Sequence, residues 1–119
     1  MSEHVSFLLS LSINPGQFEN LKTLVTEMVE TNQKNEVGTL IFEWAISEDR
    51  QMCDIYERYR DSAAVMKHVE SFGANFATRF LEALTLTRFV VYGTPSEQVK
   101  DTLAAWKPIY MAPFGGFTR

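Results

Sequence analysis

The sequence has little of the chemistry that covalent cross-links and metal clusters require. Cys53 is the only cysteine among the 119 residues, so no disulfide can form within one chain. A single thiol also cannot build a cysteine-based metal cluster. A chain without an internal disulfide or a cysteine-based metal cluster is typical of a reducing compartment, and we expect a cytoplasmic protein.

Long runs of one kind of residue are also absent. The longest apolar stretches, such as residues 89–92, are far too short to cross a bilayer, and no basic segment leads into an apolar stretch near the N-terminus. The net charge is −4, and the 11 lysines and arginines are scattered. Nucleic-acid-binding proteins usually gather such residues in a basic patch. The sequence therefore predicts no export, no membrane partner and no nucleic-acid partner.

Apolar residues are plentiful and regularly spaced. They make up 45% of the chain, enough for one core at this length. Alternation at period two predicts strands at residues 5–13, 37–47, 51–60 and 83–92. Spacings of three and four predict helices that begin after Asn14 and after Asp61, each of which we expect to act as an N-cap. We expect Gly73 to end the second helix and residues 75–81 to add a short helical piece.

The order βαββαβ is typical of a ferredoxin-like α+β sandwich with a four-stranded antiparallel sheet. Two helices can cover only one face of that sheet. On the second strand, the row that holds Phe42 and Trp44, or the alternate row that holds Ile41 and Ala45, is then left uncovered. A second copy of the chain would cover it. We therefore predict a homodimer whose paired sheets enclose an apolar pocket.

The C-terminal region differs from the rest of the chain. We assign residues 1–95 to the ferredoxin-like domain and residues 96–119 to a helix, 96–106, followed by an extended tail. The tail contains apolar side chains that would each gain roughly 1.5–3 kcal/mol on burial: Ile109, Tyr110, Met111, Phe114 and Phe117. The tail is therefore expected to pack on its own domain or on the partner.

A spaced motif joins the third strand to the second helix. It reads Glu57-x-Tyr59-x-Asp61-x-x-Ala64-Val65-x-x-His68-x-x-Ser71. In residues and in spacing it resembles the signature of the antibiotic biosynthesis monooxygenase domain family, and residues 38–44 resemble the second strand of that family. The resemblance covers residues 5–93 and implies a dimeric α/β barrel. For some members it also implies cofactor-free oxidation of quinols or related phenols by molecular oxygen.

Two departures from related proteins bear on cofactors. Many members of the family carry a further histidine soon after the motif serine, whereas residues 72–76 here read Phe-Gly-Ala-Asn-Phe. Haem-degrading relatives of the same barrel use an axial histidine in a later helix, and no histidine follows His68. We therefore expect neither haem nor any other bound cofactor.

His68 is the candidate catalytic residue. An imidazole with a pKa near neutrality beside an apolar cleft can accept a phenolic proton at physiological pH. The alternative is a structural histidine that fills space and forms a hydrogen bond with a neighbouring strand. Glu57 and Asp61 have structural interpretations, because a strand glutamate can form a cross-strand ion pair and an aspartate can cap a helix.

Aromatic residues are the candidates for binding a flat substrate. They are Phe42, Trp44, Tyr56 and Phe89. Arg88 interrupts an apolar row of the fourth strand, so it either orients the substrate or pairs with an acidic neighbour. Asn75 and Arg79 are placed at the mouth of the pocket, with simple solvation as the alternative.

Three functions remain open at this stage. The first is a cofactor-independent monooxygenase that acts on a small quinol or phenolic aromatic. The second is a non-catalytic dimer that binds a small ligand or is associated with stress. The third is a cofactor-free isomerase of a small carbonyl compound. Oxygen consumption distinguishes the first from the other two, and the sequence leaves open whether the protein is an enzyme.

Overall fold

The computed structural model describes residues 3–119, and Met1 and Ser2 lie outside it. The elements are β1 (Val5–Ile13), α1 (Phe18–Asn35), β2 (Thr39–Ile46), β3 (Met52–Tyr59), α2 (Ser62–Asn75), α3 (Ala77–Ala83), β4 (Leu84–Tyr92), α4 (Glu97–Leu103), the 3-10 turn η1 (Ala104–Trp106) and β5 (Ile109–Met111). The predicted α+β class is confirmed. Within residues 3–119, no helix combines the length and apolar character needed to span a membrane.

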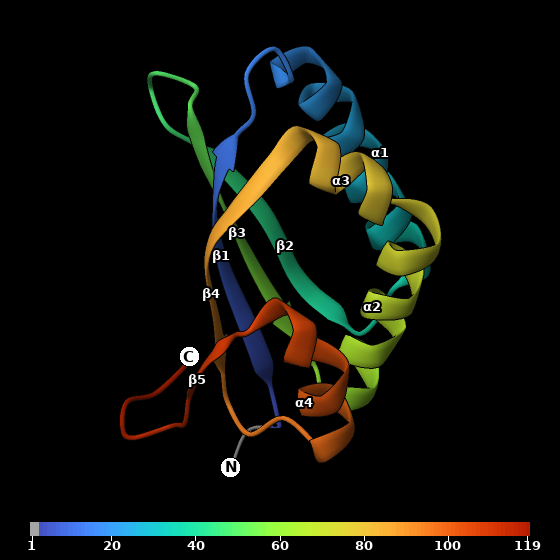
Figure 1. Cartoon of the computed structure of the whole chain (residues 1–119). Helices are drawn as coiled ribbons and strands as arrows, with labels where there is room; N and C mark the ends of the chain where they lie inside the picture. Colours follow the sequence, from blue (N-terminus) through green and yellow to red (C-terminus); the bar gives the residue numbers. More distant parts are fainter. Residues whose placement is uncertain (1–2) are drawn as a thin grey trace.

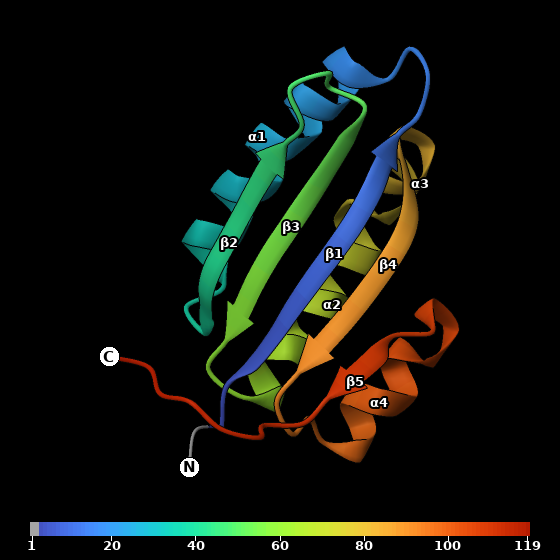
Figure 2. The same ribbon diagram turned by 90° about the vertical axis from the view of Figure 1, so that its left-hand side faces the viewer.

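The sheet has five strands in the order β2-β3-β1-β4-β5 (Figure 2). The first four are antiparallel, but β5 runs parallel to β4, with Ile109 beside Val90 and Met111 beside Tyr92. The prediction of a purely antiparallel four-stranded sheet was therefore wrong at one edge. A helical crossover is needed to return the chain parallel to its preceding strand, and α4 provides it.

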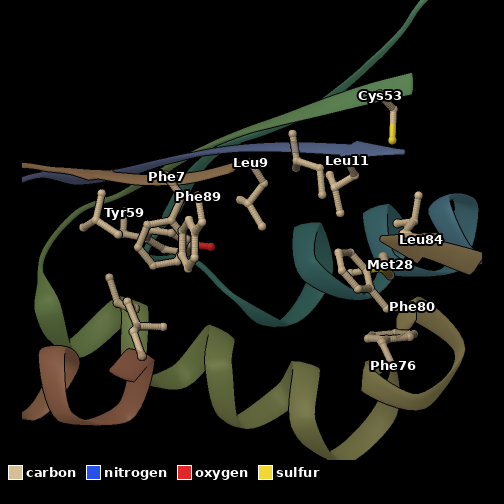
Figure 3. Close-up of a cluster of buried hydrophobic side chains, with 14 of the residues drawn as sticks. Phe7, Leu9, Leu11, Met28, Cys53, Tyr59, Phe76, Phe80, Leu84 and Phe89 are labelled. Carbon is tan, nitrogen blue, oxygen red and sulfur yellow. The ribbon is translucent and has the colours of Figure 1, made fainter. Parts of the chain in front are cut away.

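The helices lie on one face of the sheet, and the main core fills the space between the two layers (Figure 1). Phe7 and Phe89 point into this space from β1 and β4, with their ring centroids 5.1 Å apart. Figure 3 shows these rings and, at the opposite end of the core, Met28 and Phe80. The core is thus lined by rings and long aliphatic side chains from both layers.

A β-bulge in β4 decides which of its side chains face the helices. Ser10 pairs with Arg88, but the next residue of β1, Leu11, pairs with Leu86, so Thr87 is the extra residue. Leu86 therefore packs against the core, whereas Arg88 is exposed on the opposite face. The prediction that Arg88 interrupts one continuous apolar row of β4 was wrong, because strict alternation does not continue through a bulge.

The open face of the sheet has mixed polarity. On β2, Phe42 and Trp44 pack against the core, so the alternate row of this strand, which holds Ile41 and Glu43, faces outward. The pairing register adds one serine from β1 and charged or aromatic residues from β3 and β4 to this face: Ser10, Asp54, Tyr56, Arg58 and Arg88. The open face is therefore less apolar than the row of Phe42 and Trp44 suggested.

Two helix boundaries differ from their predictions. Asn14 does not cap α1, which begins at Phe18; instead its amide donates to the Glu82 carbonyl at 3.0 Å and accepts from the Thr85 hydroxyl at 2.7 Å. Gly73 lies within α2, which continues to Asn75. The Asp61 cap is confirmed, because its side chain accepts a hydrogen bond from the Ala64 amide at 2.9 Å.

Candidate active site

An apolar cavity of about 60 Å³ lies between the sheet and the helices of a single chain. Its walls are Phe7, Leu9, Met28, Phe42, Ile55, Glu57, His68, Val69, Phe72, Phe80, Phe89, Leu103 and Trp106. We had expected the pocket between the paired sheets of a dimer. The cavity that contains His68 lies instead on the helix-covered face, because the side chains of Phe42 and Phe89 point toward α2.

His68 reaches this cavity from α2. The Asp61 cap fixes the start of the helix, and His68 follows Ala64 and Val65 by four and three residues, so all three share the inward face. The side chain is buried, and each ring nitrogen has a carboxylate beside it. Nδ1 lies 2.9 Å from Glu36 Oε1, and Nε2 lies 3.3 Å from Glu57 Oε1.

The two carboxyl groups come from different elements. Glu36 directly follows α1, is buried and also accepts a hydrogen bond from the Thr39 hydroxyl at 2.8 Å. Glu57 points inward from β3, where Phe7 and Phe42 flank it on the neighbouring strands, and it accepts a hydrogen bond from the Tyr59 hydroxyl. Glu57 thus contacts an imidazole and a phenol rather than forming the predicted cross-strand ion pair. We call the row the Glu36–His68–Glu57 relay.

The pKa values of the two carboxyl groups of the relay are shifted in opposite directions. Burial raises the pKa of Glu57, and the charge of His68 only partly opposes this effect. Burial also opposes ionisation of Glu36, but its hydrogen bond to His68 and the charge of that ring together lower the Glu36 pKa. Burial favours a neutral His68, yet the charges of Glu57 and Glu36 outweigh it and raise the His68 pKa. Glu36 is therefore the stronger acid and Glu57 the more readily protonated group.

The contacts of the relay are of the kind that can pass a proton between neighbouring groups. Its carboxylates approach opposite nitrogens of one ring, and among residues 3–119 no group of three or more His, Cys, Asp or Glu side chains is arranged to hold a metal ion. Of the described residues that line the cavity, only His68 and Glu57 are ionisable in the range where acid–base catalysis operates. An imidazole and a carboxyl group therefore face one apolar space, and these are the two kinds of group that acid–base catalysis uses.

Three of the predicted site residues meet at the cavity. Phe42 and Phe89 line it together with His68, and the Phe42 ring centroid lies 5.8 Å from that of His68. Trp44 stacks edge-on against Phe42 but lines a separate groove beside α1. Its indole nitrogen is buried and has no hydrogen-bond partner among the described residues.

The remaining predicted residues lie away from the cavity. Tyr56 is on the open face of the sheet because Ile55 and Glu57 on either side of it point inward, and Arg88 is there because it lies beyond the bulge, next to the inward Phe89. Asn75 is exposed at the C-terminal end of α2, and Arg79 forms an ion pair with Glu27 on α1. The substrate-binding role predicted for these four residues has no support from their position in one chain.

Sequence reasoning missed Glu36, Tyr59 and Trp106. Tyr59 belongs to the motif and lies two residues after Glu57, so period two places both on one face. Glu36 ends a surface helix, and no sequence pattern marks it as buried. Trp106 follows α4, and only the tertiary path of the C-terminal region brings it to the cavity.

The C-terminal region closes one side of the cavity. Leu103 and Trp106 line it, and the Trp106 ring lies 6.0 Å from that of Phe72 on α2. Beyond it, β5 fixes the chain to the edge of β4. Ligand pockets usually measure about 300 Å³ or more. The cavity would therefore have to widen to admit a ring compound. The wall formed by Trp106 belongs to the C-terminal region and not to the four antiparallel strands or the helices α1 to α3.

Solved structures resemble this chain, although no protein-family model and no curated protein matches its sequence. MupZ from Pseudomonas fluorescens superimposes with a TM-score of 0.85 at 19% identity, over 99% of this chain and 96% of that one. A candidate antibiotic biosynthesis monooxygenase from Nitrosomonas europaea gives 0.67 at 17% identity, over 77% and 90%. Another, from Bacteroides thetaiotaomicron, gives 0.65 at 22% identity, over 71% and 84%. The chain therefore has the fold of the antibiotic biosynthesis monooxygenase-like proteins, as the motif at residues 57–71 predicted.

Proposed function

We propose that this protein is a cofactor-independent oxygenase of a small phenolic aromatic and that His68 is its base. The observation that carries the proposal is the buried imidazole of His68, which contacts carboxyl groups on both sides and faces an apolar cavity lined by phenylalanines. The fold shared with candidate antibiotic biosynthesis monooxygenases supports it.

The proposed chemistry begins with proton transfer. His68 accepts the phenolic proton, and the Glu36 carboxylate stabilises the resulting imidazolium. The phenolate is electron-rich enough to pass an electron to molecular oxygen, and the two radicals combine to form a carbon–oxygen bond. The rings of Phe42 and Phe89 would hold the aromatic substrate and exclude water. With 1-naphthol as the substrate, one oxygen molecule yields 1,4-naphthoquinone and water.

Oxygen uptake tests the proposal directly. The purified protein with 1-naphthol should consume one oxygen molecule for each naphthoquinone formed, measured with an oxygen electrode and by absorbance. Turnover should persist after dialysis against a chelator and should stop without oxygen. A folded protein that binds 1-naphthol but consumes no oxygen would contradict the proposal and favour the ligand-binding alternative.

A second function is favoured by the acid on the other side of His68. The raised pKa of Glu57 provides a proton donor next to a base, which is the pair that isomerisation of a small carbonyl compound requires. Such an enzyme would exchange an α-hydrogen of a cyclic ketone with deuterium from D₂O, with or without oxygen. Deuterium exchange without oxygen uptake would therefore assign the site to isomerisation.

We also propose that two copies associate through the open face of the sheet. The tail projects on this side of the sheet, away from the helices (Figure 1). Its Phe114 and Phe117 side chains are almost fully exposed in a single chain. Burial of each against a partner would stabilise a dimer by roughly 1.5–3 kcal/mol.

Light scattering checks this assembly. The full chain should be a dimer at micromolar concentration, and truncation after Met111 should shift it toward the monomer because both exposed rings are removed. Val37→Ser is the matched control, since Val37 is also exposed but lies at the turn before β2. A monomeric full chain, or an unchanged dimer after truncation, would contradict the role of the tail.

A further inference from the structure

We infer that Glu57 is a second catalytic residue, the proton donor that allows the oxygen–oxygen bond of a substrate hydroperoxide to break. The inference rests on the proposed oxygenase function and adds to it a residue and a substrate preference. The geometry assigns this role to Glu57 because it faces the cavity, whereas Glu36 contacts His68 from the other side.

The position of Glu57 is that of a group in contact with substrate. It lines the cavity, is 4% exposed and lies 3.3 Å from the His68 ring nitrogen that Glu36 does not contact. Glu36 is absent from the cavity wall. Of these two carboxyl groups, Glu57 is therefore the one with direct access to a molecule in the cavity.

The surroundings of Glu57 favour its protonated form. The groups that face it are His68, the Tyr59 hydroxyl and, beyond the imidazole, the Glu36 carboxylate. Among residues 3–119, no lysine or arginine lines the cavity or forms an ion pair with Glu57. Burial without such a cation raises the pKa of Glu57, and burial also raises that of Tyr59, which therefore keeps its proton.

A proton donor is required late in the reaction. After 1-naphthol combines with oxygen at carbon 4, the peroxide anion takes the proton held by His68 and becomes a hydroperoxide. His68 then removes the hydrogen from carbon 4, the electrons of that carbon–hydrogen bond form the new carbonyl, and the oxygen–oxygen bond breaks. The departing hydroxide takes the proton of Glu57 and leaves as water. The proton on His68 then returns to Glu57, which restores both groups.

The same geometry restricts the substrate class. The described cavity wall has one carboxyl group, one imidazole and no fixed cation. An anionic substituent would enter without a partner beside a second acidic group, which is costly in an apolar space. We therefore expect neutral phenols to react and carboxylated ones to be excluded. The oxidation of 1-naphthol should be faster than that of 1-hydroxy-2-naphthoate by at least ~10-fold, a difference that corresponds to ~1.4 kcal/mol.

The variant Glu57→Gln tests the role, because glutamine fills the same space but cannot release a proton. In rapidly quenched reactions with 1-naphthol, it should lower naphthoquinone formation ~10²-fold more than it lowers oxygen uptake, so the hydroperoxide should accumulate. Glu57→Asp retains an acid and should restore part of the quinone yield. Glu36→Gln is the comparison variant, since it acts through the base and should lower oxygen uptake and quinone formation together.

The outcomes separate the inference from the proposed function. Wild-type protein without oxygen uptake would overturn the oxygenase itself and the inference with it. If the wild-type protein takes up oxygen but folded Glu57→Gln loses oxygen uptake and quinone formation equally, that result would overturn the role of Glu57 alone. Unchanged quinone formation in that variant would do the same. A misfolded Glu57→Gln variant leaves Glu57→Asp as the test: the shorter acid should lower quinone formation more than oxygen uptake, and an equal change in the two rates of folded Glu57→Asp would overturn the inference.

Discussion

Replacement of His68 by alanine should lower oxygen uptake with 1-naphthol by ~10²-fold or more, the scale expected when a general base is lost. The described cavity wall offers no other group that can take the phenolic proton near neutral pH. The other ionisable group on that wall is Glu57, and burial raises its pKa, which suits it to the role of an acid rather than of a second base. The residual rate would be that of the uncatalysed oxidation of bound naphthol.

Folding of the variant has to be measured beside its activity. In His68→Ala, the carboxyl groups of Glu36 and Glu57 lose their shared partner and face a new void, which is destabilising. His68→Gln is the gentler variant, because its amide can still form hydrogen bonds but cannot accept a proton. His4→Ala, at the other histidine, is the matched control. Normal uptake by a folded His68→Gln variant would make His68 a packing residue.

The pH dependence provides an independent check on the same residue. Since the pKa of His68 is raised above 6.5, the base form becomes available only as the pH rises through that higher value, so the wild-type rate should rise with it. Stability should change in the opposite direction. Between the unfolded pKa of about 6.5 and the higher folded pKa, the folded chain keeps the proton on His68 and the unfolded chain loses it. The contribution of His68 to the free energy of unfolding therefore falls as the pH rises through this range. His68→Gln should remove this component from urea-denaturation curves.

The sequence predicted most of the fold because each element carries a local signal. Period-two rows gave the four antiparallel strands, and the Asp61 cap fixed the start of α2. The fifth strand could not be predicted in this way, because β5 covers only Ile109–Met111 and forms through pairing with β4. A three-residue strand has too little pattern of its own to predict it.

Prediction of the site succeeded where a side chain follows local periodicity. His68 and Phe42 both lie at the cavity for that reason. The bulge in β4 places Arg88 outside, while Tyr56 was assigned to the pocket although it alternates with the inward Ile55 and Glu57. Glu36 needed tertiary information, since only the packing of α2 against the turn after α1 brings it to the His68 ring.

Most residues of the motif that carried the resemblance now have a physical role. Glu57 and Tyr59 belong to the hydrogen-bonded site, and Asp61 caps α2. Ala64 is buried where α2 meets the backbone that leads into β2. A methyl group placed on Gly38 would lie 2.6 Å from the Ala64 Cβ, so the helix and this turn are already as close as two small residues allow. That approach lies two residues from Glu36.

Ala64→Val should therefore destabilise the protein by about 1–3 kcal/mol, the usual cost of overpacking. The added methyl groups would meet the backbone at Gly38, and the helix would have to move away from the turn. Ala63→Val is the matched control, since Ala63 is exposed on the same turn of α2 and should lose only about 0.5 kcal/mol of helix propensity. Urea denaturation of both variants measures the difference.

The same substitution should also change the site, because α2 carries His68 and the turn carries Glu36. Displacement of the helix lengthens the 2.9 Å contact between His68 Nδ1 and Glu36 Oε1, and with it weakens the interaction that helps to raise the His68 pKa. NMR titration should therefore show the His68 pKa moving down in Ala64→Val but not in Ala63→Val. Equal stability of the two variants would show that the contact at Gly38 yields without cost. A destabilised Ala64→Val variant with an unchanged His68 pKa would show that the relay does not depend on the close packing of α2 against this turn.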